Sequence, residues 1–171
     1  LVVDEAYIDF SSQDSLSRYI SEYQNLIVLQ TLSKAYGMAA LRLGLAFADD
    51  RTMGMFANVK YPYNISLAGM EKAMGLLRRD VSSEVELIKS ERRRLADALA
   101  DLPRVRKVWP SDANFLLVQV DDARGLYAEL LDAQVIVRDR SKVSGCEGCL
   151  RITVGTPQEN DKVLAVIGGL K

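Results

Sequence analysis

Lys34 follows directly after an apolar run, in the stretch TLSKAYGMAALRLG that spans residues 31–44. A lysine at the mouth of a packed sheet is unfavourable unless its amine takes part in chemistry, because desolvation disfavours the ammonium form and leaves a nucleophilic amine. Such an amine acts as a covalent catalyst chiefly by forming a Schiff base with a carbonyl. Ser33 precedes this lysine and Arg42 follows it, and both residue types suit a phosphate, which arginine binds in a fork.

Asp4 and Tyr7 lie at the end of a second apolar run, in LVVDEAYIDF. A carboxylate suits a protonated ring nitrogen, and a phenol suits a ring oxygen. Together with the Lys34 amine and the phosphate ligands, they describe a pyridine ring that bears an aldehyde, a hydroxyl and a phosphate, which is pyridoxal 5'-phosphate. Structural roles are open to the same residues: Asp4 could cap a helix, Tyr7 could be core, and Arg42 could pair with a surface acid.

Three continuous apolar runs are predicted to be strands that position these residues, and helices are expected between and after them. Such runs are typical of a sheet that helices bury on both faces, which predicts an α/β layer structure. The predicted strands are Leu1–Val3, Asn25–Thr31 and Leu43–Asp49, and the predicted helices are Leu16–Glu22 and Ser66–Leu77.

The second half of the chain predicts a smaller α/β domain. It opens with a helix that has a capping box from Ser83 to Glu86 and an ERRR run expected to be a solvated face. A last helix starts at Thr156, with a second capping box at TPQE. Between them we expect strands at NFLLVQV, VIV and LRITV and a helix at Ala123–Leu131. We therefore divide the chain into residues 1–78, part of a large domain, and residues 79–171, a small domain.

The composition excludes several classes of protein. A formal net charge of -1 leaves no electrostatic footprint for nucleic acid or a membrane surface. No apolar run approaches the roughly 18 residues of a membrane span, and no signal peptide is visible, so we expect a cytoplasmic protein. Because Leu1 starts within an apparent buried strand, we also expect the C-terminal part of a longer chain.

Histidine is absent, which excludes a Ser-His-Asp triad and every metal site that needs histidine. Two cysteines remain, Cys146 and Cys149, in GCEGCL. Zinc would need a second pair of ligands, and a redox motif is expected at a helix start, whereas this one precedes a strand. We interpret them as reduced thiols in a loop and predict no metal site.

The stretches quoted above resemble the histidinol-phosphate aminotransferases, which belong to the fold-type I, class II aminotransferases. The resemblance covers the whole chain and is carried by VVDEAYIDF, TLSKAYGMAALRLG, SDANFLLVQV, VIVRDRS and GCLRITVGTPQEN. It implies the C-terminal half of a pyridoxal-phosphate enzyme that exchanges an amino group between histidinol phosphate and 2-oxoglutarate or glutamate, a step of histidine biosynthesis. It also implies a homodimer when the protein is full length.

The resemblance implies a role for each candidate residue in the large-domain part of the chain. Lys34 would be the catalytic residue, holding the cofactor covalently and moving a proton at the substrate. Asp4 would keep the pyridine nitrogen protonated, and Tyr7 would hydrogen-bond the ring oxygen. Ser33 and Arg42 would bind the phosphate.

The resemblance also implies that two arginines of the small domain bind the substrate. Arg151 sits in LRITV, whose apolar neighbours share one strand face while the arginine turns to the other. It is expected to meet a substrate carboxylate, with a buried ion pair as the alternative. Arg138, in VIVRD, matches a position associated with the substrate phosphate, and Asn114 is expected to be structural.

Members of the family are about twice as long, and by the resemblance the upstream half supplies the glycine-rich phosphate turn, a ring stacked on the cofactor and an arm that completes a neighbouring subunit. We therefore expect this chain alone to bind cofactor weakly. A threonine-phosphate decarboxylase of the same fold, or a non-catalytic domain that keeps only the fold, are the alternatives.

Overall fold

The computed structural model describes residues 1–169. Contacts within the chain divide it into two compact units, Leu1–Val85 and a second unit that begins at Glu86. The division falls inside helix α3 (Ser82–Ala100). Each unit is described by itself, and the domain boundary expected after residue 78 stays a prediction.

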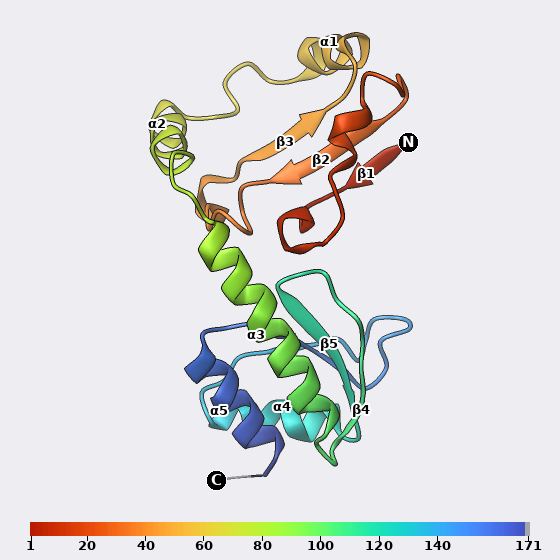
Figure 1. The fold of residues 1–171 in the computed structure, drawn as a ribbon, viewed down its shortest axis with the longest axis vertical. Helices are drawn as coiled ribbons and strands as arrows, with labels where there is room; N and C mark the ends of the chain where they lie inside the picture. Colours follow the sequence, from red (N-terminus) through yellow and green to blue (C-terminus); the bar gives the residue numbers. More distant parts are fainter. Residues whose placement is uncertain (170–171) are drawn as a thin grey trace. The chain divides into compact units, whose positions relative to one another are not determined.

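The first unit is built on a three-stranded sheet in the order β1-β2-β3 (Figure 1). Its strands are β1 (Val2–Asp4), β2 (Ile27–Thr31) and β3 (Gly44–Phe47). β1 and β2 run parallel, whereas β3 is antiparallel to β2. The carboxyl ends of β1 and β2 and the amino end of β3 therefore meet at one edge of the sheet.

The expectation that both faces of this sheet are buried is wrong for the described residues. Val28 of β2 is fully buried, but Leu29 on the same strand is 37% exposed and Leu45 of β3 is 41% exposed. Alternation along β2 sends Leu29 to the face opposite Val28, whereas the register of β2 with β3 places Leu45, opposite Gln30, on the same face as Val28. Both faces therefore keep an exposed leucine among residues 1–169, although the apolar runs are typical of strands covered on both sides.

Two helices follow the sheet, each with a polar cap at its start. Asp49 accepts hydrogen bonds from the first backbone N–H groups of α1 (Asp50–Val59), and Ser66 does so for α2 (Leu67–Leu76). The prediction of a helix over Ser66–Leu77 is confirmed. Helix α1 was not anticipated, although an Asp before a helical run is a recognised start signal. The segment expected to be a helix near Leu16 forms only a short 3-10 turn, η2 (Leu16–Tyr19).

The second unit packs three helices against one face of an antiparallel sheet in the order β4-β5-β7-β6 (Figure 1). Its strands are β4 (Val105–Val108), β5 (Phe115–Val120), β6 (Arg138–Asp139) and β7 (Cys149–Thr153), and its other helices are α4 (Ala123–Asp132) and α5 (Pro157–Ile167). Alternate residues of β5 are buried, which is the pattern of a sheet with one covered face. The core joins side chains of α3, α4 and α5 to that face, among them Leu95, Leu99, Leu126, Leu130, Ile152 and Ile167.

The strand predicted at VIV is wrong, because residues 135–137 lie outside the sheet and β6 begins only at Arg138. Helix α4 ends in a Schellman-type turn in which Gln134 has a positive φ of 58°. The N–H of Val135 donates to the carbonyl of Leu130 at 2.7 Å, and that of Gln134 donates to Leu131. These bonds use backbone groups that a strand would need for its ladder.

The two predicted capping boxes have different outcomes. The box at TPQE is confirmed, since Thr156 and Glu159 cap α5 reciprocally. The box at Ser83 is wrong. Helix α3 starts one residue earlier, and the N–H of Ser82 donates to Asp80, while Glu86 pairs with Lys89 instead.

Candidate functional site

The sheet edge of the first unit brings together the residues that the sequence singled out there. Asp4 is the last residue of β1, and Lys34 follows the end of β2 at Thr31. Arg42 lies just before β3, whose first residue, Gly44, pairs with Thr31. Ligands of open α/β sheets bind outside the carboxyl ends of such parallel strands, so this edge is a candidate site.

Tyr7 and Lys34 are neighbours at this edge. The Nζ atom of Lys34 lies 5.2 Å from the centre of the Tyr7 ring, which is within the range of a cation–π contact. Tyr7 immediately precedes the 3-10 turn η1 (Ile8–Phe10), whose Phe10 is fully buried and anchors the turn. The phenol is therefore held next to the amine by a packed segment.

Ser33 and Arg42 belong to one corner, which Thr31 organises. The Thr31 hydroxyl donates to the carbonyl of Leu43 at 3.2 Å and accepts from the N–H of Ser33 at 3.1 Å; it also lies 2.9 Å from the Ser33 hydroxyl. Arg42 has a φ of 56°, in the left-handed region. Non-glycine residues rarely adopt this conformation, and it concentrates at functional positions.

The Lys34 side chain is exposed among residues 1–169. The burial expected for its amine is therefore wrong for the described residues, since the surrounding segments do not cover it. Asp4 is likewise exposed, and its Oδ1 accepts a hydrogen bond from the N–H of Ala6 at 3.0 Å. The Asp4 carboxylate and the Lys34 amine are therefore both exposed at this edge of the sheet.

Glu5 supports this edge and was not identified from the sequence. Its buried carboxylate accepts hydrogen bonds from Ser15 at 2.6 Å, the N–H of Leu16 at 2.7 Å and the amide of Gln30 at 2.9 Å. Burial raises the pKa of Glu5, but these hydrogen bonds outweigh it and hold the pKa below its ordinary value. The residue next to Asp4 is thus fixed to β2. The only sequence feature that could have identified Glu5 is its position beside Asp4, as a second carboxylate directly after an apolar strand.

In the second unit, Arg138 and Arg151 lie directly opposite each other on β6 and β7. Residues paired in this way project from the same sheet face about 4.5–5.5 Å apart at Cβ, and like charges there are unfavourable. The Arg151 guanidinium lies 5.0 Å from the centre of the Phe115 ring. Its buried Nε has no hydrogen-bond partner among the described residues. An anion would give the Arg151 Nε a partner and offset the repulsion between the two guanidinium groups.

The remaining residues named from the sequence lie in structural positions. The carbonyl of Asn114 accepts from the N–H of Val154 at 2.9 Å and extends the pairing of β5 with β7. Both cysteines are free thiols, Cys146 half-buried and Cys149 buried. Within residues 1–169, no group of three or more histidine, cysteine or acidic side chains is placed to hold a metal ion, and no helix there is both long and apolar enough to cross a membrane.

The ERRR run differs from the expected solvated face. Glu91 and Arg92 are both buried, because each has a partner far along the chain. Arg92 donates to the carbonyl of Ala113 at 2.8 Å, and Glu91 accepts from the Asn160 amide at 2.8 Å. These bonds fix α3 against the sheet and the start of α5.

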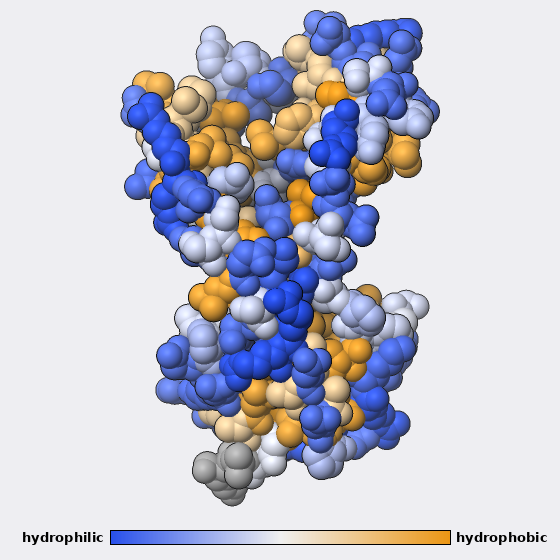
Figure 2. All heavy atoms as spheres, in the orientation of Figure 1, coloured by the Kyte–Doolittle hydropathy of each residue, from blue (hydrophilic) through white to orange (hydrophobic). Residues whose placement is uncertain are grey.

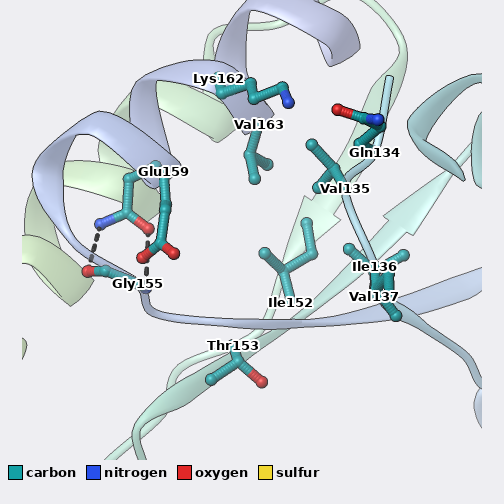
Figure 3. Close-up of a pocket in the computed structure, with 11 residues that line it drawn as sticks. Gln134, Val135, Ile136, Val137, Ile152, Thr153, Gly155, Glu159, Lys162 and Val163 are labelled. Carbon is teal, nitrogen blue, oxygen red and sulfur yellow. Dashed lines mark hydrogen bonds between the residues drawn. The ribbon is translucent and has the colours of Figure 1, made fainter. Parts of the chain in front are cut away.

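A hollow of about 420 Å³ lies beside residues 135–137, between the end of α4 and the start of β6 in the chain (Figure 3). Figure 3 shows Ile152 and Val163 at its floor, with the polar ends of Gln134 and Lys162 near its rim. Arg138 and Arg151 are not among its lining residues. We therefore separate this hollow from the arginine pair and assign the candidate anion site to the pair.

Comparison with known proteins gives consistent results along the chain. The family model described as aminotransferase class I and II matches residues 1–167. The histidinol-phosphate aminotransferase of Parabacteroides distasonis is 48% identical over 173 residues, which covers 100% of this chain and 50% of the relative. That of Flavobacterium psychrophilum is 42% identical and is covered to 49%. The chain spans about half the length of the curated relatives it matches.

Solved structures agree on the fold. The histidinol-phosphate aminotransferase of Sinorhizobium meliloti, solved in complex with pyridoxal-5'-phosphate, has a TM-score of 0.85 at 26% identity, with 99% of this chain and 48% of that chain covered. The L-threonine-O-3-phosphate decarboxylase of Porphyromonas gingivalis has a TM-score of 0.86 at 24% identity, with 98% and 54% covered. The second likeness concerns the fold alone.

Proposed function

Because the chain belongs to the class I and II aminotransferase family, we propose that it forms the C-terminal half of a pyridoxal-phosphate-dependent transaminase. The proposed reaction exchanges an amino group between histidinol phosphate and 2-oxoglutarate or glutamate, as the names of its relatives suggest. The observation that carries the proposal is the sheet edge of the first unit, where Asp4, Tyr7, Lys34 and Arg42 come together.

The residues at this edge fit the cofactor by their chemistry. Lys34 keeps its amine exposed beside the Tyr7 phenol, so an amine for the cofactor aldehyde and a hydrogen-bond donor for a ring oxygen are adjacent. The left-handed Arg42 and the hydroxyl of Ser33 share the corner held by Thr31, which suits a phosphate. When bound, pyridoxal phosphate supplies an electron sink next to the bond that the reaction breaks.

The proposal assigns a role to each of these side chains. The Asp4 carboxylate holds a proton on the ring nitrogen, and the Tyr7 hydroxyl donates to the ring oxygen. Ser33 and Arg42 bind the phosphate and so orient the ring. The Lys34 amine would hold the cofactor through its aldehyde, and as a free amine it would move a proton at the substrate α-carbon.

The arginine pair supports the substrate part of the proposal. Arg138 and Arg151 present two guanidinium groups on one face of the second unit's sheet. Both proposed substrates are anionic, one through a phosphate and the other through two carboxylates. We assign Arg151 to a carboxylate and Arg138 to the phosphate.

Labelling of Lys34 tests the proposal in the full-length protein. Borohydride reduction in the presence of pyridoxal phosphate, followed by peptide mapping, should place the cofactor on Lys34. Lys34→Ala should lose both the label and turnover. Lys60→Ala, which removes an exposed lysine bonded to Asn64, should keep both. Label on Lys60 or Lys142 would contradict the assignment.

A decarboxylase of the same fold is the second candidate, since a decarboxylase from Sulfurospirillum multivorans is similar to this chain at 27% identity with a TM-score of 0.85. It would use the same lysine with a different outcome. Product analysis with histidinol phosphate and with threonine phosphate separates the two reactions: amino transfer to 2-oxoglutarate supports the transaminase, and release of carbon dioxide supports the decarboxylase. Failure of the full-length protein to bind cofactor would favour a non-catalytic domain.

Self-association is also part of the proposal. Hydrophobic side chains reach the surface of the first unit (Figure 2). Two aromatic side chains there, Tyr61 and Tyr63, are 84% and 94% exposed. Exposed aromatic residues of this kind mark interaction surfaces, which supports a homodimer of the full-length protein. Sedimentation of that protein tests it, and a monomer at micromolar concentration would contradict it. The cytoplasmic location expected from the sequence stays a prediction.

A further inference from the structure

The two cysteines occupy the first and fourth positions of a tight turn at the start of β7. The N–H of Cys149 donates to the carbonyl of Cys146 at 3.0 Å, and Gly148 at the third position has a φ of 70°. This is the pattern of a type II turn, which brings its end Cα atoms within about 7 Å. A disulfide needs Cα atoms about 4.4–6.8 Å apart, so the turn holds the pair near bonding distance.

The two thiols differ in access. The Cys149 sulfur lies 3.7 Å from the carbonyl of Glu147, inside the turn. Burial raises the pKa of the Cys149 thiol, and the nearby Cys146 raises it further. Cys146 is half-buried and is the thiol that a solute reaches first. Accessible thiols react ahead of buried ones.

We propose that Cys146 and Cys149 form a reversible disulfide, a modification site that takes a hydroperoxide as its oxidant. The Cys146 thiolate attacks the peroxide oxygen, the O–O bond breaks, and a sulfenic acid forms with release of water or an alcohol. The Cys149 sulfur then attacks the Cys146 sulfur, the S–O bond breaks, and the hydroxide leaves as water with the Cys149 proton. The two thiols lose two electrons in total, and the peroxide gains them.

The disulfide would close inside the hairpin that carries the arginine pair. The carbonyl of Cys149 accepts the hydrogen bond from the N–H of Arg140 at 2.9 Å, next to the short pairing of β6 with β7. Since this bond uses only the backbone, oxidation of the sulfur leaves it in place. The site rests on the turn geometry alone and does not depend on the proposed function.

The full-length protein is treated with hydrogen peroxide, quenched, unfolded, alkylated and digested. The mass of the peptide that holds Cys146 and Cys149, the two cysteines of this sequence, is then measured. We expect both alkylation sites to disappear together with loss of two hydrogens, no cross-linked dimer on a non-reducing gel, and full recovery with dithiothreitol. Thiols that disappear one at a time, or a cross-link between chains, would overturn the proposal.

Two variants fix the order of the steps. Cys149→Ser should accumulate a sulfenic acid at Cys146 that dimedone traps. Cys146→Ser should react with peroxide at least about tenfold more slowly than the unmodified protein, because Cys149 is buried and protected thiols are inert. Far-ultraviolet circular dichroism checks that each variant is folded, because Trp109 lies beside Cys149 and its fluorescence would respond to the substitution itself. Equal rates in the two variants would contradict the assignment of Cys146 as the first thiol.

Discussion

Asn160→Ala removes a buried polar side chain whose hydrogen bonds the structure gives in full, and we expect it to destabilise the second unit strongly. The side chain is 1% exposed at the start of α5. Its Oδ1 accepts from the N–H of Gly155 at 2.9 Å, and its Nδ2 donates to the carbonyl of Gly155 at 3.1 Å and to the Glu91 carboxylate at 2.8 Å. One amide therefore ties together the end of β7, the start of α5 and the middle of α3.

The magnitude follows from the three hydrogen bonds that disappear. A bond to a charged group contributes about 1.5–3 kcal/mol and each neutral one roughly 0.5–1.5 kcal/mol. Alanine leaves the groups of Gly155 and the Glu91 carboxylate without that partner in a buried place, which adds their desolvation penalty. The carboxylate keeps its fork to Arg94, which limits the loss. We expect Asn160→Ala to lower the free energy of unfolding by about 3 kcal/mol.

Urea unfolding followed by Trp109 fluorescence measures this loss in the second unit, where the only tryptophan lies. Asp161→Ala is the matched control: it removes the neighbouring residue, whose carboxylate is 64% exposed and pairs with Arg94 at 2.7 Å. Exposed pairs of this kind contribute about 0–1 kcal/mol. If the two variants unfold within about 1 kcal/mol of each other, the buried amide does not hold the unit together in the way we argue.

Three further predictions follow from named contacts. A hydrogen bond from Arg94 holds the pKa of Glu91 below its ordinary value. The stability that the Glu91 carboxylate contributes is therefore present above about pH 4.3, its pKa in the unfolded chain, and is lost as the pH falls through its pKa in the folded chain. Urea unfolding at a series of pH values should show that Glu91→Gln loses less stability on acidification than the unmodified protein. Gly148→Ala should destabilise by about 1 kcal/mol more than Gly145→Ala, because both have positive φ but only at Gly148 does an added Cβ approach a backbone oxygen, at 3.3 Å; equal losses in chemical unfolding would contradict the contact. Arg151→Lys in the full-length protein should weaken the glutamate half-reaction about tenfold to a hundredfold and the histidinol-phosphate one less, since lysine lacks the fork; single-turnover kinetics that show equal losses would give Arg151 a different partner.

Local sequence patterns predicted the structure correctly where it depends on residues that are close together in the chain. The alternation in LRITV correctly placed Leu150 and Ile152 in the core and Arg151 on the other face. The reciprocal cap at Thr156 involves residues three apart, so its sequence signature was enough. The apolar runs of the first unit located all three strands within a few residues.

Prediction failed where distant partners decide the outcome. The ERRR run has the pattern of a solvated face, yet Glu91 is buried and hydrogen-bonded to Asn160. Because Asn160 lies 69 positions further along the chain, the local pattern does not reveal this partner. Residues 135–137 have strand-forming side chains, but the cap of α4 takes the Val135 N–H first. The opposition of Arg138 and Arg151 depends on strand register, which no single motif specifies.

That opposition is itself an argument about function. Two arginines directly across a strand pair repel each other, so they lower the stability of the unliganded sheet. The apolar side chains of β7 that hold the core lie on the opposite face, and the core would be the same with neutral residues at both arginine positions. An anion between the guanidinium groups reverses the sign of the local interaction and gives the unpaired Nε of Arg151 a partner. This opposition is the physical basis of our proposal that the pair binds an anion.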